Sequence, residues 1–560
     1  MEKIWLKHYP PGVPADIDPE QIASIKHLFE DACRQHAALP AFSNLGKTLT
    51  YAEMDELSRR FGAWLQAEAG LRKGDRVAIM MPNLLQYPIA IFGAMRAGLI
   101  VVNVNPMYTA RELEHQLNDS GATTIVVCDM ACAVLQQVID RTPVRKVVVT
   151  GIGDQLGLLK GSIVNLVMRY VKRLVPDWTL PGAVHFNDAL SAGAALTLRP
   201  VELAPHDVAF LQYTGGTTGV SKGAVLTHRN LIANTLQIVN WMPELKQIGA
   251  DAVVITALPL YHIFALTTNC LVFTYVGGQN VLITNPRDMP AFVDEMSKVR
   301  FTFITGVNTL FNTLLNTPGF DRLDFSSLKI ALGGGMAVQG AVSNRWKSLT
   351  GRHICQGWGL TETSPVGTCN RPEELNFTGS IGYPLASTDI SIRDDDGNEL
   401  PVGQAGEICL RGPQVMQGYW NRPDETAKVM SPGGWLRTGD VGRMDEAGLT
   451  YIEDRKKDMI LVSGFNVYPN EVEAVVAQMP DVLEVAAVAQ DDERSGEVVA
   501  LFVVKKHPAL TAEDILAHCR LELTGYKLPK FIYFRDELPK TNVGKILRRS
   551  LRDELKHKAA

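Results

Sequence analysis

Short apolar runs that alternate with longer helical patterns constrain the fold of this chain more than any other feature. Four runs rich in Val, Ile and Met lie at 76–81, 124–128, 146–150 and 252–256. They are continuous rather than alternating, which is typical of strands buried on both faces of parallel sheets. The segment 50–70 carries apolar residues at helical spacing. The sequence therefore predicts a large α/β body of mainly parallel sheets covered by helices.

A change of pattern near residue 455 indicates a second, smaller domain. The chain has 560 residues, which is too long for one ordinary hydrophobic core. After the charged segment 454–458, helices and strands are again expected, at 469–478, 484–489, 498–504 and 512–523. About 100 residues is a usual domain size. We predict a body over 1–455 and a hinged α+β domain over 456–560, with the charged segment at the hinge.

Composition and charge exclude several classes of protein. A hydrophobic content of 46%, a charged content of 21% and a net charge of -5 describe a globular chain without the basic excess of nucleic-acid-binding proteins. No run reaches the roughly 18 uncharged apolar residues of a membrane-spanning helix, and the first residues lack the apolar run of a secretory signal. The eight cysteines lack zinc-like spacing. We expect a cytoplasmic protein with reduced thiols, several of them buried.

A glycine-rich segment at 213–223 carries the strongest local signal of chemistry. It contains four glycines, four Ser or Thr residues and one lysine, directly after the strand-like run 208–212. Glycines let backbone N–H groups approach phosphate oxygens closely, and hydroxyl groups add donors. The common P-loop is excluded because Lys222 is followed by Gly223 and not by Ser or Thr. We predict a phosphate-binding loop of another family.

Six further motifs follow this loop in a fixed order. They are PLYH at 259–262, GWGLTET at 357–363, GWLRTGD at 434–440, DRKKD at 454–458, SGFNVYPNEVE at 463–473 and PKTNVGKI at 539–546. Together with the loop, they resemble the signatures of the acyl-adenylate-forming superfamily, which includes acyl-coenzyme A synthetases, coumarate ligases, luciferases and peptide-synthetase adenylation domains. The resemblance implies that the protein is an acid–thiol ligase, which activates a carboxylic acid as an acyl-adenylate with ATP and passes the acyl group to coenzyme A.

The resemblance also implies which residues bind the nucleotide and coenzyme A. They are Tyr213, Thr214, Gly215, Gly216, Thr217, Thr218, Gly219, Ser221, Lys222, Gly223, Gly335, Gly357, Trp358, Asp440, Arg455, Lys457 and Gly464. Glu362 and Thr218 are implied to hold Mg²⁺ beside the phosphates, and Asp440 to accept hydrogen bonds from the ribose hydroxyls. Trp358 stands where the family usually has tyrosine, so an indole replaces a phenol beside the adenine.

Lys545, Glu362, Thr361 and His262 form the implied catalytic set. Because the reaction brings two anions together, the ammonium of Lys545 would stabilise the charge of the transition state. An ordinary surface lysine is the alternative, since other cations lie nearby, but the Gly-Lys context of the motif favours catalysis. Thr361 resembles a residue that donates a hydrogen bond to a phosphate. His262 resembles a residue that positions the substrate. Lys457, in turn, resembles the pivot of a rotating small domain.

A wider resemblance, from residues 49–53 onward and especially at 304–311 and 333–336, is to bacterial long-chain fatty-acid–coenzyme A ligases. It implies a long-chain fatty acid as substrate and AMP and pyrophosphate as products, with acyl-coenzyme A feeding fatty-acid β-oxidation. Two alternatives stay open. One is a ligase for medium-chain or aryl acids. The other is a membrane-associated fatty-acid uptake or binding factor with vestigial catalysis, which the intact Lys545 and Glu362 oppose.

The segment 158–175 combines a helical apolar face with Arg169, Lys172 and Arg173. A basic amphipathic helix of this kind can lie on an anionic membrane surface, here the inner membrane. A surface helix packed on its own domain is the alternative interpretation. Relatives in the family are often dimers, so a homodimer is a further expectation.

Overall fold

The fold is that of a computed structural model, which describes residues 2–214, 221–374, 376–492 and 494–559. The four apolar runs are strands of two large sheets, as predicted: β3 (Arg76–Met80), β5 (Thr124–Cys128), β6 (Lys146–Thr150) and β10 (Val253–Thr256). Nearly all of their residues are buried, on both faces of the sheets. This burial explains why the runs are continuously apolar.

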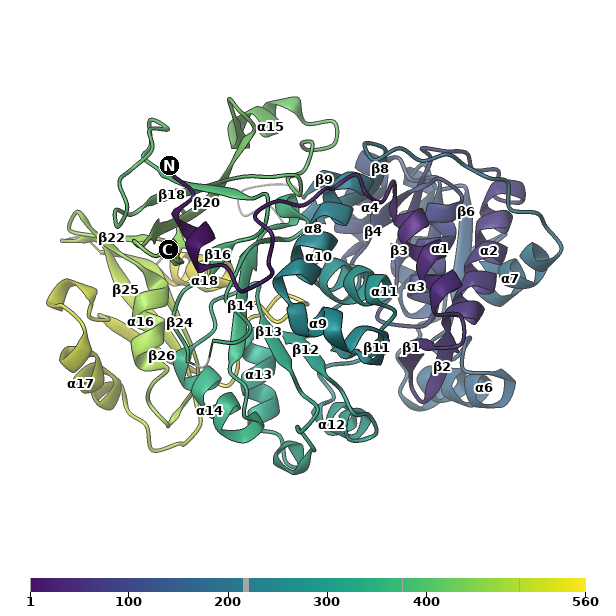
Figure 1. Cartoon of the computed structure of the whole chain (residues 1–560). Helices are drawn as coiled ribbons and strands as arrows, with labels where there is room; N and C mark the ends of the chain where they lie inside the picture. The colour runs from purple at the N-terminus through teal and green to yellow at the C-terminus, as the bar shows by residue number, and fades with distance from the viewer. Residues whose placement is uncertain (1, 215–220, 375, 493, 560) are drawn as a thin grey trace.

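Among the described residues, one large sheet has seven strands in the order β7-β6-β5-β3-β4-β8-β9 (Figure 1). Its other strands are β4 (Ile100–Asn103), β7 (Val184–His185), β8 (Val208–Thr214) and β9 (Lys222–Thr227). Neighbouring strands are parallel except β8 and β9, which pair antiparallel. The predicted phosphate loop thus joins the edge strand β9 to its neighbour β8.

The other large sheet has nine strands within the same described ranges, in the order β16-β15-β14-β13-β12-β10-β11-β1-β2. They include β1 (Pro40–Asn44), β2 (Lys47–Thr50), β11 (Gln279–Leu282), β12 (Phe303–Gly306), β13 (Ile330–Gly333), β14 (Ile354–Gly359), β15 (Val366–Cys369) and β16 (Tyr383–Pro384). The strands from β1 to β14 in this order are parallel. The carboxyl ends of β12, β13 and β14 therefore meet at one edge of the sheet.

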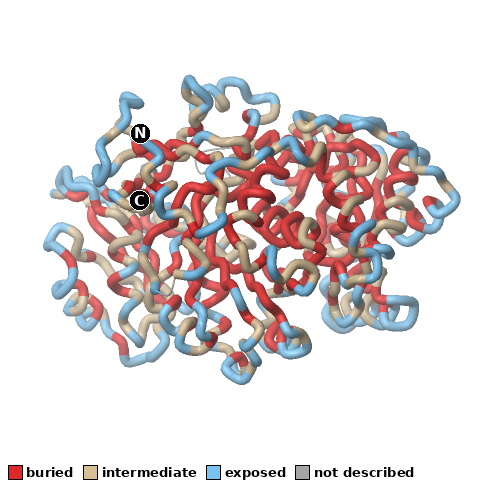
Figure 2. The backbone as a smooth tube through the Cα atoms, in the orientation of Figure 1, coloured by how far each residue is buried: buried red, intermediate tan, exposed pale blue. Residues whose placement is uncertain are grey.

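One set of helices shares a single hydrophobic core with both large sheets. Figure 2 colours every buried residue red, and this core is part of that red interior. These helices are α1 (Ile25–Gln35), α2 (Tyr51–Ala67), α3 (Gln86–Arg96), α8 (His228–Trp241), α10 (Ile263–Ala265) and α11 (Val272–Val276). The predicted helix in segment 50–70 is α2, which begins after Thr50 because the hydroxyl of Thr50 and the carboxylate of Glu53 form a reciprocal cap.

Other helices cover the outer faces or connect strands. They are α4 (Ala110–Ser120), α5 (Cys132–Gln136), α7 (Phe186–Ala194), α9 (Pro243–Ile248), α12 (Met289–Ser297), α13 (Asn308–Leu315), α14 (Gly340–Thr350) and α15 (Pro423–Val429). The apolar residues of α4 and α5 form a separate core with the seven-stranded sheet. Helices α12, α13 and α14 connect successive strands of the nine-stranded sheet.

A third, antiparallel sheet follows the two large ones. It contains β17 (Asp389–Arg393), β18 (Gly406–Arg411), β19 (Met430–Ser431), β20 (Trp435–Met444) and β21 (Thr450–Arg455). The predicted domain boundary, between 455 and 456, falls directly after β21.

The small domain has its own sheet and its own cores. Its elements are β22 (Ile460–Val462), β23 (Phe465–Val467), α16 (Pro469–Val476), β24 (Val482–Asp492), β25 (Gly496–Lys505), α17 (Ala512–Glu522), β26 (Phe531–Arg535) and α18 (Arg548–Ala559). Alternate residues of β24 and β25 enter two clusters, one with α16 and α17 and one with α18. The predicted fold class is confirmed: a large α/β body with mainly parallel sheets and a smaller α+β domain.

The predicted helix at 158–175 is shorter than expected. It consists of α6 (Leu158–Leu166) and a π-helix, η4 (Val167–Val171), and the backbone leaves helical geometry at Arg173, where φ is 52°. Within the described ranges, no helix combines the length and the apolar character that crossing a bilayer requires. All eight cysteines are buried, more than the several that the sequence predicts.

Candidate functional site

The candidate site lies at the carboxyl edge of the nine-stranded sheet. Gly335 follows β13, Trp358 lies near the end of β14, and Glu362 stands in a short 3₁₀ turn, Thr361–Thr363, directly after β14. In open α/β sheets, ligands bind at this edge because the loops after the strands converge there. The sheet therefore brings three of the motif residues together.

Lys545 reaches this edge from the small domain. A Cβ atom built at Gly335 would lie 2.9 Å from Cε and 3.5 Å from Nζ of Lys545. The φ of Gly335 is 76°, so the left-handed backbone and the close approach both require glycine. The Thr309 hydroxyl on α13 donates to the Gly544 carbonyl at 2.8 Å. Contacts across the domain boundary thus set the position of the lysine.

The surroundings of Lys545 disfavour the protonated, ammonium form of its side chain. Desolvation and the positive charge of Arg455 lower the pKa of Lys545 to about 8, while Asp440 and Glu362 act in the opposite sense. These influences show that the lysine lies within electrostatic reach of two carboxylates that the motifs predict. Lys545 is still largely protonated at neutral pH.

Glu362 is held by a residue that the motifs do not predict. The hydroxyl of Tyr419 donates to Oε1 of Glu362 at 2.7 Å. The Nζ atom of Lys222 lies 4.9 Å from the centroid of the Tyr419 ring and pairs with Oε2 of Glu425 at 2.5 Å. The aromatic Tyr-Trp pair in a turn-rich segment is the one signal in the sequence that could have drawn attention to Tyr419.

The described part of the glycine-rich segment forms the base of the β8–β9 hairpin. The Ser221 hydroxyl donates to the Thr214 carbonyl at 2.8 Å, and a Cβ atom at Gly223 would lie 3.0 Å from the ring of Tyr213. The tyrosine hydroxyl donates to Asp119 at 2.7 Å. Five predicted site residues lie outside the described residues: Gly215, Gly216, Thr217, Thr218 and Gly219.

Trp358 and Asp440 form a direct contact. The indole Nε1–H donates to Oδ2 of Asp440 at 2.9 Å, and Nε of Arg455 lies 3.6 Å from the other carboxylate oxygen. Burial raises the pKa of Asp440, and the positive charge of Arg455 opposes this shift. The indole thus has a polar role that its stacking surface alone does not predict. The neighbouring Gly357 pairs with Cys369 on β15 and has no close contact at its Cβ position.

His262 is a neutral residue at the start of α10. Its Nδ1 accepts a hydrogen bond from the Phe264 N–H at 3.3 Å. Desolvation, helped by the positive charge of Lys545, lowers the pKa of His262 to about 3. The imidazole is therefore uncharged at neutral pH, which agrees with a positioning residue better than with a cationic catalyst.

Lys457 lies at the edge of this cluster, and Gly464 lies outside it. Lys457 follows β21, and its positive charge acts on Asp440. Desolvation and the positive charge of Arg455 lower the pKa of Lys457 to about 8. Gly464 occupies the exposed turn between β22 and β23 with a φ of 87°, and a Cβ atom there would meet no atom within 4 Å.

A metal ion would find few protein ligands here. Among the described residues, no group of three or more His, Cys, Asp or Glu side chains is placed to hold a metal. Glu362 supplies one carboxylate, and Thr218 lies outside the described residues. This donor set fits Mg²⁺, which in nucleotide sites takes most of its ligands from phosphates and water.

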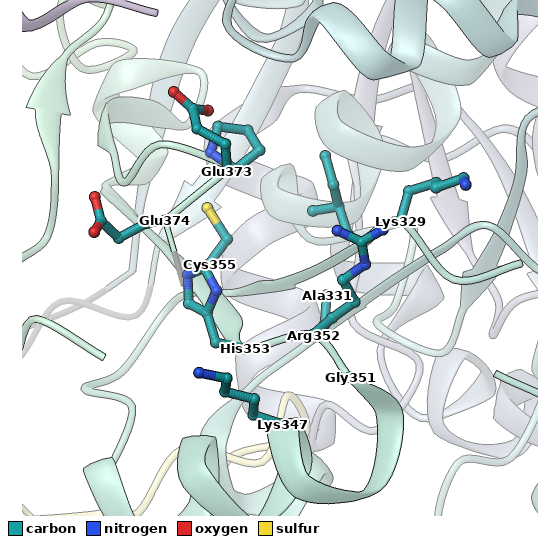
Figure 3. Close-up of a pocket in the computed structure, with 11 residues that line it drawn as sticks. Lys329, Ala331, Lys347, Gly351, Arg352, His353, Cys355, Glu373 and Glu374 are labelled. Carbon is teal, nitrogen blue, oxygen red and sulfur yellow. The ribbon is translucent and has the colours of Figure 1, made fainter. Parts of the chain in front are cut away.

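A small separate cavity lies at the opposite edge of the nine-stranded sheet (Figure 3). Its volume is about 30 Å³, and it is lined by residues that precede or begin β13 and β14, including Lys329 and His353. Such a volume holds about two water molecules. None of the predicted site residues lines this cavity, so it is not the candidate site.

Two glycines in the segments 304–311 and 333–336, which carry the resemblance to fatty-acid ligases, pack tightly. A Cβ atom at Gly306 would lie 3.0 Å from the ring of Phe311, and one at Gly334 would lie 3.1 Å from the ring of Phe264. Close packing is therefore sufficient to explain both glycines. Their small size alone does not identify the acid.

Two family models match the chain. Residues 29–420 match the model described as AMP-binding enzyme, and residues 471–545 match the model described as AMP-binding enzyme C-terminal domain. The glycine-rich segment and the motifs PLYH and GWGLTET lie in the first match. Lys545 is the last residue of the second match.

Curated relatives match over the whole chain. A long-chain-fatty-acid–CoA ligase of Escherichia coli O6:H1 is 57% identical over 559 residues, which cover 100% of this chain and 99% of the relative. A protein of the same description from Yersinia pestis is 57% identical over 554 residues, covering 99% and 98% of the two chains. One from Bacillus subtilis is 37% identical over 559 residues, covering 99% and 98%.

Solved structures share the fold. The anthranilate CoA ligase AuaEII in complex with anthranoyl-AMP has a TM-score of 0.84 at 24% identity, with 97% of this chain and 100% of that chain covered. ATP-bound MatB from Rhodopseudomonas palustris has a TM-score of 0.81 at 27% identity, with 96% and 100% covered. With the family model matched over 29–420 and relatives matched over the full length, the chain belongs to the family of AMP-binding enzymes.

Proposed function

We propose that this protein is an ATP-dependent long-chain fatty-acid–coenzyme A ligase, which releases AMP and pyrophosphate. The observation that carries the reaction type is the position of Lys545, inserted against Gly335 at the sheet edge where Glu362 and Asp440 also act on it. The identity of the acid rests on relatives of that description, which are 57% identical to this chain.

In the first half-reaction, a carboxylate oxygen of the acid attacks the α-phosphorus of ATP. The bond to the bridging oxygen breaks, and pyrophosphate leaves with its electron pair. Both reactants are anions, so positioning and charge neutralisation supply most of the catalysis. We assign the neutralisation to Lys545 and the phosphate contacts to Thr361, Lys222 and the glycine-rich loop. The carboxylate oxygen of Asp440 that faces Arg455 would accept hydrogen bonds from the ribose hydroxyls.

Glu362 would hold Mg²⁺ beside the phosphates, together with Thr218. When bound, the ion neutralises phosphate charge. Tyr419 keeps one carboxylate oxygen of Glu362 oriented by its hydrogen bond at 2.7 Å. The side chain of Glu362 is thereby positioned before the nucleotide arrives.

In the second half-reaction, the thiol of coenzyme A attacks the acyl carbon of the adenylate. A carbon–sulfur bond forms, and AMP leaves as the acyl–oxygen bond breaks. Since the co-substrate supplies the thiol, no cysteine of the enzyme takes part. Neutral His262 would position the reactants, and rotation of the small domain about Lys457 would bring the exposed Gly464 turn to the coenzyme A side.

The decisive experiment is coenzyme A-dependent AMP release across acids from acetate to oleate, with coumarate as an aryl acid. We expect the highest kcat/KM for long-chain acids. A maximum at acetate, a medium-chain acid or coumarate would refute the long-chain assignment. AMP release from no acid, with fatty-acid binding retained, would instead favour a binding factor.

We further propose that the enzyme works in the cytoplasm and contacts the inner membrane peripherally. Long-chain acids partition into bilayers, so an enzyme that uses them gains from contact with a lipid surface. A homodimer is the second assembly that we propose to test, by light scattering over a range of protein concentrations.

A further inference from the structure

The side of α6 and η4 that contacts the body combines small and polar residues with two apolar side chains, Val164 and Met168, which pack against the main core. A Cβ atom at Gly161 would lie 2.3 Å from the carbonyl oxygen of Gly153, so the two backbones are in close contact. Asn165 donates to Asp154 at 2.8 Å and accepts from the Gly153 N–H at 2.7 Å. The helix is thus fixed to its domain through glycine and amide contacts.

The opposite side of α6 and η4 carries large apolar side chains that are exposed. Leu158 is 95% exposed, Leu159 78% and Val171 74%. Eight of the 16 exposed large hydrophobic side chains among the described residues lie in this one segment: Leu158, Leu159, Ile163, Leu166, Val167, Tyr170, Val171 and Leu174. A surface helix packed on its own domain would turn such residues inward. This helix turns Val164 and Met168 inward but leaves these eight side chains exposed.

The same segment is strongly cationic. Lys160, Arg169, Lys172 and Arg173 are all exposed, and no Asp or Glu occurs between 158 and 175. Arg169 pairs with Asp177, just beyond the segment, at 3.0 Å. An exposed apolar face with cations and without acids is typical of helices that lie in the interface of an anionic bilayer.

The position of the helix leaves this face accessible. In Figure 1, α6 lies at the periphery of the body beside β1 and β2, and Lys160 donates to the carbonyl of Leu45 in the turn between those strands. Gly157, which precedes α6, and Arg173, which follows η4, both have positive φ and end the helical path. The apolar face therefore projects as one short, bounded surface.

We propose that residues 158–174 dock on an anionic lipid bilayer, with the apolar side chains in the headgroup region and Arg169, Lys172 and Arg173 against lipid phosphates. A two-fold contact with a second copy fits less well, because it would gather the cations of both copies at one self-complementary interface. Docking would bring the enzyme to membranes that hold long-chain acids, and to this extent its purpose rests on the proposed function.

The test is co-sedimentation of the full-length protein with vesicles rich in phosphatidylglycerol and with pure phosphatidylcholine vesicles. A charge variant combines Arg169→Gln, Lys172→Gln and Arg173→Gln, and an apolar variant combines Leu159→Asp with Val171→Asp. Each cation near an anionic surface changes binding by about fivefold, so the charge variant should bind about a hundredfold more weakly. The apolar variant should lose binding to both kinds of vesicle.

A matched control is Leu521→Asp, because Leu521 is 82% exposed on α17 of the small domain. This variant should bind vesicles like the unchanged protein. Ligation of a fatty acid presented in nonionic detergent, measured for every variant, shows that each is folded. It also separates the two proposals, since vesicle binding can fail while ligation persists, and the reverse.

Failure of the unchanged protein to bind anionic vesicles would overturn the docking surface. If the charge variant and the apolar variant bind anionic vesicles as tightly as the unchanged protein does, the docking surface is likewise overturned. If those variants instead abolish a dimer seen by light scattering, without any vesicle binding by the unchanged protein, the face is a contact between copies and the lipid assignment is wrong.

Discussion

The two sides of the candidate site are held in different ways. On the body, Trp358 and Glu362 are fixed by β14, a buried strand of the nine-stranded sheet, and Trp358 is tied to Asp440 on β20. On the small domain, Lys545 depends on side-chain contacts such as Thr309 with Gly544. Sheet register fixes the first side, whereas side-chain contacts with the body hold the second. We propose that the lysine is the part of the site that moves.

A buried charge network joins the end of β21 to the small domain. Arg548 contacts Asp454 at 3.2 Å and Glu473 at 2.7 Å. Asp454 also accepts from the Asn470 N–H at 2.9 Å. Asp454 is the first residue of the predicted hinge segment 454–458, so this network contributes to how the small domain is anchored.

Removing the lysine should have the largest effect. Lys545→Ala should lower adenylate formation by about a thousandfold, as expected for loss of a preorganised group that stabilises transition-state charge. ATP–pyrophosphate exchange measures this step. Lys540→Ala is the control, because Lys540 lies in the same motif but pairs with Glu484 at 2.7 Å. Exchange retained in Lys545→Ala would refute the proposed role.

Breaking the anchor should reduce stability. Arg548→Ala leaves the buried carboxylates of Asp454 and Glu473 without their cation, and such changes lower the free energy of unfolding by about 3 kcal/mol. Urea unfolding followed by circular dichroism measures the loss. Arg549→Ala, at the exposed neighbouring position, should change stability by less than about 1 kcal/mol. Equal effects of the two substitutions would show that the network does not anchor the domain.

From the sequence, the residues of the candidate site were easier to predict than the contacts between them. Ordered motifs named Glu362, Asp440 and Lys545, and the structure places the lysine within electrostatic reach of both carboxylates. The bond from Tyr419 to Glu362 was not predicted, because it joins residues 57 positions apart through a loop whose path no local pattern fixes. The indole bond of Trp358 likewise depends on where β14 meets β20.

The helix at 158–175 gives the same lesson for the fold. Helical spacing predicted an apolar face, but periodicity does not say which face meets the body. The close approach of Gly161 to Gly153 decides this, and it joins the helix to the loop that precedes it. Local patterns thus fix elements, while contacts outside the element fix its orientation.

A smaller effect is expected on the body side of the site. Tyr419→Phe removes the hydrogen bond to Glu362 and leaves the ring beside Lys222. A hydrogen bond to a charged group contributes about 1.5–3 kcal/mol, so kcat/KM should fall at least about tenfold. A positioning role predicts that higher Mg²⁺ partly restores the rate. Tyr451→Phe, which removes a bond to Asp445 at 3.2 Å, is the matched control. An unchanged Mg²⁺ dependence would contradict the role.

The pH dependence of the first half-reaction tests whether Lys545 is the group whose ionisation limits the rate. The pKa of Lys545 is lowered to about 8, so the ammonium is present below this pH and is lost as the pH rises through it. Because kcat/KM reports ionisations of the free enzyme, exchange should fall about twofold at pH near 8 and about tenfold for each further pH unit. Lys545→Arg keeps a cation at all these pH values. Its rate will be lower, but its profile should lack this descending limb. A limb that persists in Lys545→Arg would show that another group titrates, such as Lys457, whose pKa desolvation also lowers to about 8.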